Sequence, residues 1–177
     1  GLVGNPLETA VQNIDAGAFA AGIFVADVGS LTIGGIGMFA GVGALAGDVA
    51  ISATGLLTIL EQAYAQAGNV SLSAVGMTFA GGVAETGGAG TVSLQAGTGA
   101  ISTTGAGNDV LSQNLIATAT TGIDLDTTVL NITATNTGAG NINIDEVDGA
   151  NLLNVAASNG SSAVTSATGS LNVTTAS

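Results

Sequence analysis

The chain has 177 residues, the size of one domain, with 29 glycines, no Lys, Arg, His, Cys or Trp, and a formal net charge of −12. A chain without cations cannot neutralise phosphate groups, so nucleic-acid binding and attachment to an anionic membrane surface are excluded. The apolar fraction of 46%, mostly Ala, Val, Leu and Ile, predicts a narrow folded core and makes disorder the less favoured alternative.

The first segment, residues 5–17 (NPLETAVQNIDAG), carries helix-start signals in Asn5, Pro6 and Glu8. Its counterpart later in the chain, residues 124–138 (DLDTTVLNITATNTG), is rich in β-branched residues, which favour a strand. We therefore expect a strand at residues 9–14 in place of a capping helix.

Residues 28–47 form an uncharged stretch that is long enough to suggest a membrane span. The stretch is interrupted by many glycines and has no basic or aromatic flank, so strands and turns are favoured and no membrane insertion is expected.

The clearest pattern is a recurring strand. Residues 47–55 (GDVAISATG) and 68–76 (GNVSLSAVG) superpose without a gap, and related strands follow at similar spacings at 91–99 and 114–122. In each strand Val, Ile or Leu alternates with a small residue, which is the pattern of a strand with one buried face. Such a strand buries that face when the next repeat stacks on it, so the sequence predicts an all-β, parallel β-solenoid with about 21 residues per coil.

Further strands are expected between glycine-rich corners, at 22–26, 30–34, 56–60, 129–134, 141–145, 152–156 and 170–174. Residues 60–68 (LEQAYAQAG) contain good helix formers and a glycine stop, and predict a short helical turn or loop. We expect the ring of Tyr64 to lie over the solenoid wall.

A longer repeat relates residues 8–59 to residues 126–173, at an offset of 118 that later becomes 114. The chain, interpreted as one solenoid over residues 1–177, then holds about one and a half such units and starts at Gly1 without Met. This organisation predicts a segment of a longer array. No polar cap is evident at either end, so open strand edges and self-association are expected.

The residues needed for common catalytic mechanisms are missing. Without His, Lys or Cys, a Ser or Thr nucleophile has none of its usual bases. A carboxylate pair remains at Asp124 and Asp126, but solvated turn acids are the favoured interpretation, and a non-enzymatic protein is predicted.

Calcium is the cation that these acids suit best, because it prefers carboxylate and carbonyl oxygens. One candidate site comprises Asp145, Glu146 and Asp148 at a turn. A second is residues 105–111 (GAGNDVL), which resemble a single nonapeptide of the calcium-binding RTX repeat. No other cofactor is predicted.

Two segments, TAVQNIDAGAFAAGIFVADVGSLTIGGI and NITATNTGAGNINIDEVDGANLLNVAASNG, resemble the β-strand repeats of large bacterial surface proteins of the filamentous-haemagglutinin and giant-adhesin type. The resemblance implies a right-handed parallel β-helix, export to the cell exterior or cell surface, and a role in adhesion, matrix or filaments, with a cell-surface receptor as a possible partner.

Two functional hypotheses follow. The first is a structural segment of an extracellular filament or adhesin that stacks end to end through open coils. The alternative is a solenoid that binds a glycan or an ice surface. Thr118/Thr120 and Thr133/Thr135 form T-x-T pairs, but the step from one pair to the next is shorter than the expected coil, which predicts that they do not stack as a regular array.

Overall fold

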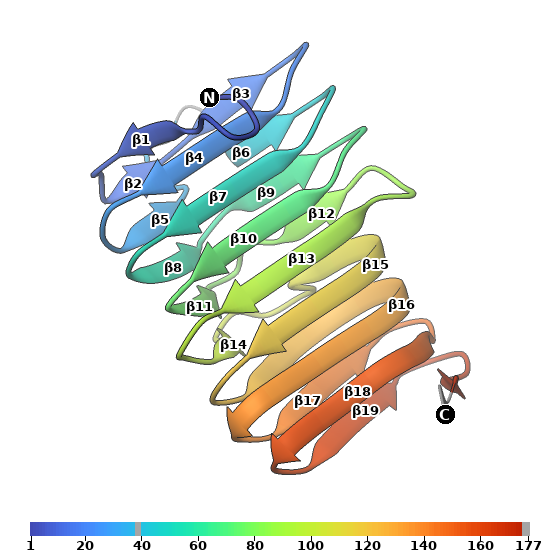
Figure 1. Cartoon of the computed structure of the whole chain (residues 1–177). Coiled ribbons are helices and arrows are strands. Elements are labelled where there is room, and N and C mark those ends of the chain that lie inside the picture. The colour runs from blue at the N-terminus through green and yellow to red at the C-terminus, as the bar shows by residue number, and fades with distance from the viewer. Residues whose placement is uncertain (38–39, 175–177) are drawn as a thin grey trace.

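The computed structural model describes residues 1–37 and 40–174, and within them every regular element is a β-strand. Twenty strands, all connected through hydrogen bonding, wind through about eight coils that are roughly 21 residues apart (Figure 1). The strands stack along the rod as three parallel sheets, which form its walls. All pairings between named strands are parallel. The predicted parallel β-solenoid is confirmed.

The winding of the coils is right-handed. In Figure 1 the strands of the near wall run from upper right to lower left while successive coils descend from the N-terminus to the C-terminus. This combination of rotation and advance describes a right-handed path.

The first sheet contains the recurring strands predicted from the sequence. Val49 pairs with Val70, Val70 with Val92, and Val92 with Leu115, so the spacings seen in the sequence are the register of the sheet. Its strands are β1 (Leu7–Thr9), β4 (Ile23–Asp27), β7 (Val49–Ala53), β10 (Val70–Ala74), β13 (Thr91–Ala96), the second half of β15 (Val110–Ala119), the second half of β16 (Ile123–Ala139), β18 (Asn151–Asn159) and β20 (Asn172–Val173).

The second sheet follows the first around each coil. Leu57 pairs with Leu31 on one side and with Met77 on the other, and the same column continues to Ile101, Ile123 and Ile142. Its strands are β2 (Asn13–Ile14), β5 (Leu31–Ile33), β8 (Leu56–Ile59), β11 (Gly76–Phe79), β14 (Ile101–Thr103), the start of β16, β17 (Ile142–Glu146) and β19 (Ser162–Ser166).

A third sheet closes the N-terminal coils. It contains β3 (Ala16–Ala18), β6 (Gly41–Ala44), β9 (Gln62–Ala65), β12 (Ala84–Thr86), the start of β15 and the middle of β16. Beyond β16 the described coils have two strands each, because β17 leads to β18 without a third strand between them. The solenoid therefore changes from three sheets to two along its length.

The helical turn expected at residues 60–68 is wrong, because β9 occupies Gln62–Ala65 within the third sheet. Ala63 and Ala65 point inward and are fully buried, while Tyr64 between them is half-buried on the outer side, facing Gly43 and Glu85 in neighbouring coils. Stacking on β6 and β12 supplies inter-strand hydrogen bonds that outweigh the local helix preference of Ala and Gln.

No capping helix forms in the N-terminal segment, but the single strand expected at residues 9–14 is wrong: the segment forms β1, β2 and β3, and residues 10–12 form a corner between β1 and β2. Residues 28–47 supply β5 and β6, although residues 38 and 39 of that stretch lie outside the described residues. In the described part of the chain, no helix is long and apolar enough to cross a membrane.

The core is a column of alternating inward side chains. Phe79, Leu57 and Ile59 are among its largest fully buried residues, and alanines fill inward positions of the third sheet in β9 and β12. Glycine allows the tight corners: Gly140 has a φ of 132°, and a Cβ there would meet the Thr121 carbonyl oxygen at 2.3 Å.

Candidate functional site

Of the three acids of the first calcium hypothesis, Asp145 points away from Glu146 and Asp148. Asp145 is exposed on the outer side of β17 and accepts a hydrogen bond from the Thr165 hydroxyl. Glu146, the next residue, is buried, and Asp148 is exposed in the following turn. The alternation of side chains along a strand separates Asp145 from Glu146, so the structure does not bring the three carboxylates together.

Glu146 instead stabilises the wall of the solenoid. Its Oε2 accepts hydrogen bonds from Thr127 Oγ1 at 2.6 Å and from the Val129 backbone N–H at 3.2 Å. Burial raises the pKa of its carboxyl and the neighbouring Asp148 carboxyl raises it further, while the Thr127 hydroxyl and backbone N–H groups oppose that rise.

The second calcium hypothesis concerns Asp109 in the RTX-like segment. Asp109 is 2% exposed and accepts hydrogen bonds from Thr103 Oγ1 at 3.1 Å and from the Asp126 backbone N–H at 2.8 Å. Burial raises its pKa from 3.8 to about 6. Within residues 1–37 and 40–174, no group of three or more acids is arranged to hold a metal ion.

The carboxylate pair, Asp124 and Asp126, lies on the outer face of the second sheet. Asp126 is opposite Asp145 in the next coil, and Asp124 accepts a hydrogen bond from Asn143 Nδ2 at 2.8 Å. Partial burial raises the pKa of Asp126, and the negative charges of Asp145 and Asp124 raise it further. The pair forms an acidic strip on the outer surface of the wall.

Sequence reasoning missed a recurring arrangement of buried carboxylates. Asp27 accepts hydrogen bonds from Thr9 Oγ1 at 2.7 Å and from the Val11 backbone N–H at 3.0 Å. Asp109 and Glu146 likewise each accept from one threonine hydroxyl and at least one backbone N–H group. Three acids that appear in the sequence to be solvated therefore join neighbouring strands or coils.

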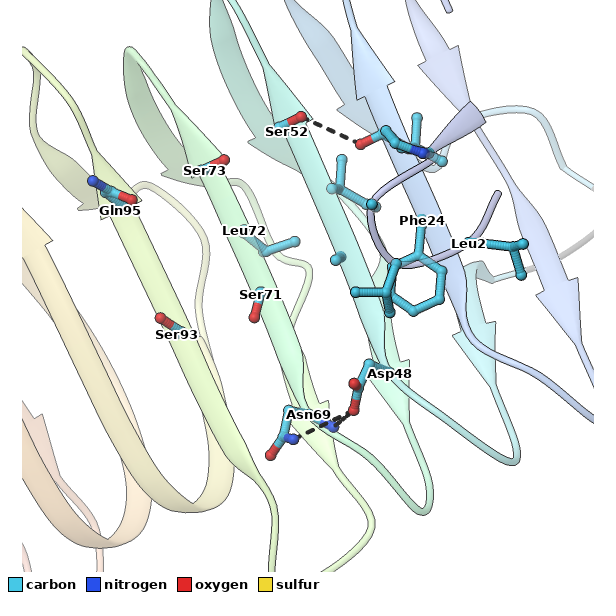
Figure 2. Close-up of a pocket in the computed structure, with 16 residues that line it drawn as sticks. Leu2, Phe24, Asp48, Ser52, Asn69, Ser71, Leu72, Ser73, Ser93 and Gln95 are labelled. Atoms are coloured by element: carbon cyan, nitrogen blue, oxygen red, sulfur yellow. Dashed lines mark hydrogen bonds between the residues drawn. The ribbon is translucent and has the colours of Figure 1, made fainter. Parts of the chain in front are cut away.

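The most prominent concave feature lies on the outer face of the first sheet, over β4, β7, β10 and β13 (Figure 2). It is a groove of about 590 Å³ whose floor is formed by small outward side chains. The serines of the floor are Ser52 on β7, Ser71 and Ser73 on β10, and Ser93 on β13, which Figure 2 shows in successive strands together with Gln95.

The side of the groove nearest the N-terminus, next to the serine floor, is apolar. The ring of Phe24 on β4 is half-buried, and Leu2 and Val3 of the N-terminal segment stand beside it. Leu2 and Asn5 each donate a backbone N–H hydrogen bond to the carbonyl oxygen of the other, at 2.8 and 3.0 Å, and this pair of bonds closes a tight turn. Gly22 makes room for the ring, because a Cβ at that position would meet a Phe24 ring carbon at 2.7 Å.

One edge of the groove coincides with a column of hydrogen-bonding side chains. Asp48 Oδ1 accepts from the Asn69 backbone N–H at 2.8 Å (Figure 2). Asn69 Oδ1 in turn accepts from the Thr91 backbone N–H at 2.9 Å. The column continues as an asparagine ladder in which Asn131 donates to Asn114, Asn151 to Asn131, and Asn172 to Asn151, at 2.8, 3.0 and 3.2 Å.

The two ends of the described stack have open edges. In the described residues β1, β2 and β3 pair only with β4, β5 and β6, and β19 and β20 pair only with β17 and β18. A hollow of about 440 Å³ at the C-terminal end is lined by Leu152, Leu153, Val155, Val164 and Val173, among others. Leu153 is 45% exposed and Val173 is 69% exposed.

The two threonine pairs do not stack as a regular array, as predicted. The local coil is shorter than those before it, so Thr118 pairs with Thr135, whereas Thr133 lies opposite Ile116. The two T-x-T pairs are therefore out of register between β15 and β16.

The chain matches no family model, no curated protein and no solved structure.

Proposed function

We propose that the chain is a non-enzymatic structural segment of an extracellular filament or surface adhesin, a rod whose end coils stack on further coils. The observation that carries this proposal is the open edge of the parallel sheet at each end of the described stack. An unpaired strand edge leaves backbone N–H and C=O groups available to another strand, which is the basis of β-augmentation.

The side chains at the C-terminal end favour the same interpretation. Val173, which continues the inward column of the buried Ile132, is 69% exposed there, and Leu153, the extra residue of a bulge in β18, is 45% exposed. Within the described residues the asparagine ladder ends at Asn172, whose amide donates to Asn151, and an asparagine at the same position of a following coil would extend the ladder. Residues 149–177 contain no Asp or Glu, so another acidic chain meets little repulsion at this end.

The extracellular assignment is supported by composition. A chain without Cys folds in any redox compartment, and one without Lys and Arg has no cleavage sites for trypsin-like proteases. The absence of His, Lys and Cys, and the use of Asp27, Asp109 and Glu146 as buried hydrogen-bond acceptors, support a structural role over a catalytic one.

The test is negative-stain microscopy and analytical ultracentrifugation of the purified chain over increasing concentration. One rod of eight coils at about 4.8 Å per coil is on the order of 40 Å long. We expect longer particles, of the same width, to increase with concentration.

Leu153→Lys places a charge in the C-terminal hollow and should shift the distribution to single rods. Ile116→Lys is the matched control, because Ile116 is also 45% exposed but lies on the outer face of β15, away from both ends. Single rods at all concentrations, or equal effects of the two variants, would refute stacking through the ends.

A further inference from the structure

We propose that the groove on the outer face of the first sheet binds a neutral, extended saccharide chain built of β-linked pyranose units. This role concerns the side wall of the rod and does not depend on stacking at its ends. The argument combines the charge of the groove, its free hydrogen-bonding groups, its aromatic side and its spacing.

The charge of the groove excludes anionic polymers. Asp48 is the one residue with a charged side chain among those that line it, and the chain has no cationic side chain to balance it. An anionic polysaccharide would therefore meet repulsion both from Asp48 and from the net charge of −12. A neutral ligand with hydroxyl groups meets no such repulsion, and Asp48 can accept hydrogen bonds from it.

The floor of the groove offers unused hydrogen-bonding groups. Ser71, Ser73, Ser93 and Gln95 have no side-chain hydrogen bond to any other described residue, and their side chains face outward. Each serine hydroxyl is both a donor and an acceptor, and the Gln95 amide is the same. A saccharide chain, which carries donors and acceptors on every unit, matches this surface chemically.

The apolar side of the groove complements the other face of a sugar. A pyranose ring presents polarised C–H groups on its flat face, and the negative face of an aromatic ring attracts them. Phe24 supplies such a ring at the N-terminal side of the serine rows, with Leu2 beside it (Figure 2). A site with an apolar wall and a few oriented polar groups is typical of small-ligand binding.

The spacing of the coils sets the direction of the ligand. Adjacent strands lie about 4.8 Å apart, which is close to the length of one pyranose unit in an extended β-linked chain. A chain lying parallel to the solenoid axis would thus place about one unit over each of β4, β7, β10 and β13.

The N-terminal segment distinguishes this ligand from a second copy of the rod. Leu2 and Val3 rise above the outer face beside Phe24, and they are 68% and 77% exposed. Two flat sheets could not pack closely across this raised turn, whereas a single saccharide chain is narrow enough to lie beside it.

The experiment is a titration of the isotopically labelled chain with four hexasaccharides, monitored by amide chemical shifts. Cellohexaose and chitohexaose are neutral and extended, maltohexaose is neutral and coiled, and an alginate hexamer is extended and anionic. We expect saturable shifts from at least one of the first two, located on β7, β10 and β13, and at least tenfold weaker binding of the other two.

Two variants test the site itself. Phe24→Ala should weaken binding about tenfold, whereas Phe19→Ala, which removes an 80% exposed ring outside the groove, should not. Ser71→Val removes a floor hydroxyl while keeping a residue suited to a strand, and Thr58→Val on the second sheet is its control.

Four results would overturn the proposal: no saturable shift with either extended neutral chain, equal binding of alginate, shifts located away from the groove, or equal effects of Phe24→Ala and Phe19→Ala. Unchanged binding after Ser71→Val, in a variant with wild-type amide spectra elsewhere, would count against the serine floor and so against this mode of binding.

Discussion

The buried carboxyl of Asp109 predicts that the protein becomes less stable as the pH rises from about 4 to about 6. Asp109 is 2% exposed, and burial raises its pKa from 3.8 to about 6 in the folded chain. Between these two values the folded state binds a proton that the unfolded state has lost. The free energy of unfolding therefore falls as the pH rises through this window, and the stabilisation is fully present only below the unfolded pKa.

The size of the effect follows from the same two values. A rise from 3.8 to about 6, at about 1.4 kcal/mol for each pKa unit, corresponds to at most roughly 3 kcal/mol lost between pH 4 and pH 7. Asp109→Asn removes this pH-dependent loss of unfolding free energy, because the amide cannot ionise. The amide oxygen can still accept from the Asp126 backbone N–H, and its NH₂ group can donate to the Thr103 hydroxyl.

The measurement is urea unfolding of the wild type and of Asp109→Asn at pH 4, 5, 6 and 7. The variant should be similar in stability to the wild type near pH 4 and more stable by up to about 3 kcal/mol at pH 7. Glu8→Gln, at an exposed position of β1, is the control and should show no such growing difference. A variant that is less stable than the wild type at pH 7, or a difference that is independent of pH, would refute the reasoning.

Three further predictions concern the ladder, the core and calcium. Asn131→Ala removes the hydrogen bonds to Asn114 and from Asn151 and should lower the free energy of unfolding by about 1–3 kcal/mol in urea titrations; an unchanged midpoint would contradict a stabilising ladder. Leu57→Ala, at a fully buried position, should lower the free energy of unfolding by about 2–5 kcal/mol in the same assay. Leu56→Ala, at the exposed neighbouring position, should change it by less than about 0.5 kcal/mol. Similar losses in the two variants would disprove the assigned strand faces. Calcium should release no heat in isothermal titration, since Asp145 and Glu146 point to opposite sides of β17; a saturable signal lost in Asp145→Asn would restore the calcium hypothesis.

The first and second sheets could be predicted in outline because their strands bury large aliphatic side chains. Val49, Val70 and Val92 recur with the period of the coil, and the structure places them in direct register. The pattern is strong because a one-residue slip would turn every such side chain outward.

The third sheet could not be predicted, because its inward positions carry small residues. Ala63, Ala65 and Ala84 are fully buried, and alanine has no preference for a strand. Local sequence therefore favoured a helix at Gln62–Ala65, whereas the stacking of neighbouring coils determines the observed strand. The signal that could have identified this sheet is the separation of Ala63 from Ala84, which equals that of Val49 from Val70 in the first sheet.

The register of the coils could not be predicted throughout, because coil length varies along the chain. Coils in this chain differ in length: Ile23 of β4 pairs with Val49 of β7, whereas the much closer Asn114 and Asn131 pair between β15 and β16. The longer repeat, which stays a prediction, is also out of phase with the coils. Ile14 lies in the second sheet, whereas Ile132, its match, lies in the first.

The groove was missed because its residues are individually ordinary. Phe24, Ser71 and Gln95 are far apart in the sequence and come together only through the stacking register. Sequence reasoning searched for charged and nucleophilic groups, whereas this surface consists of hydroxyl, amide and aromatic groups. Alignment of the strands by coil, followed by comparison of the outward positions, could have found it.

The loss of the third sheet after β16 makes the rod unequal at its two ends. The N-terminal edge presents three short walls, whereas the C-terminal edge presents two. Any fibre assembled head to tail from such rods would consequently be directional, with a two-walled tip at one extremity and a three-walled tip at the other.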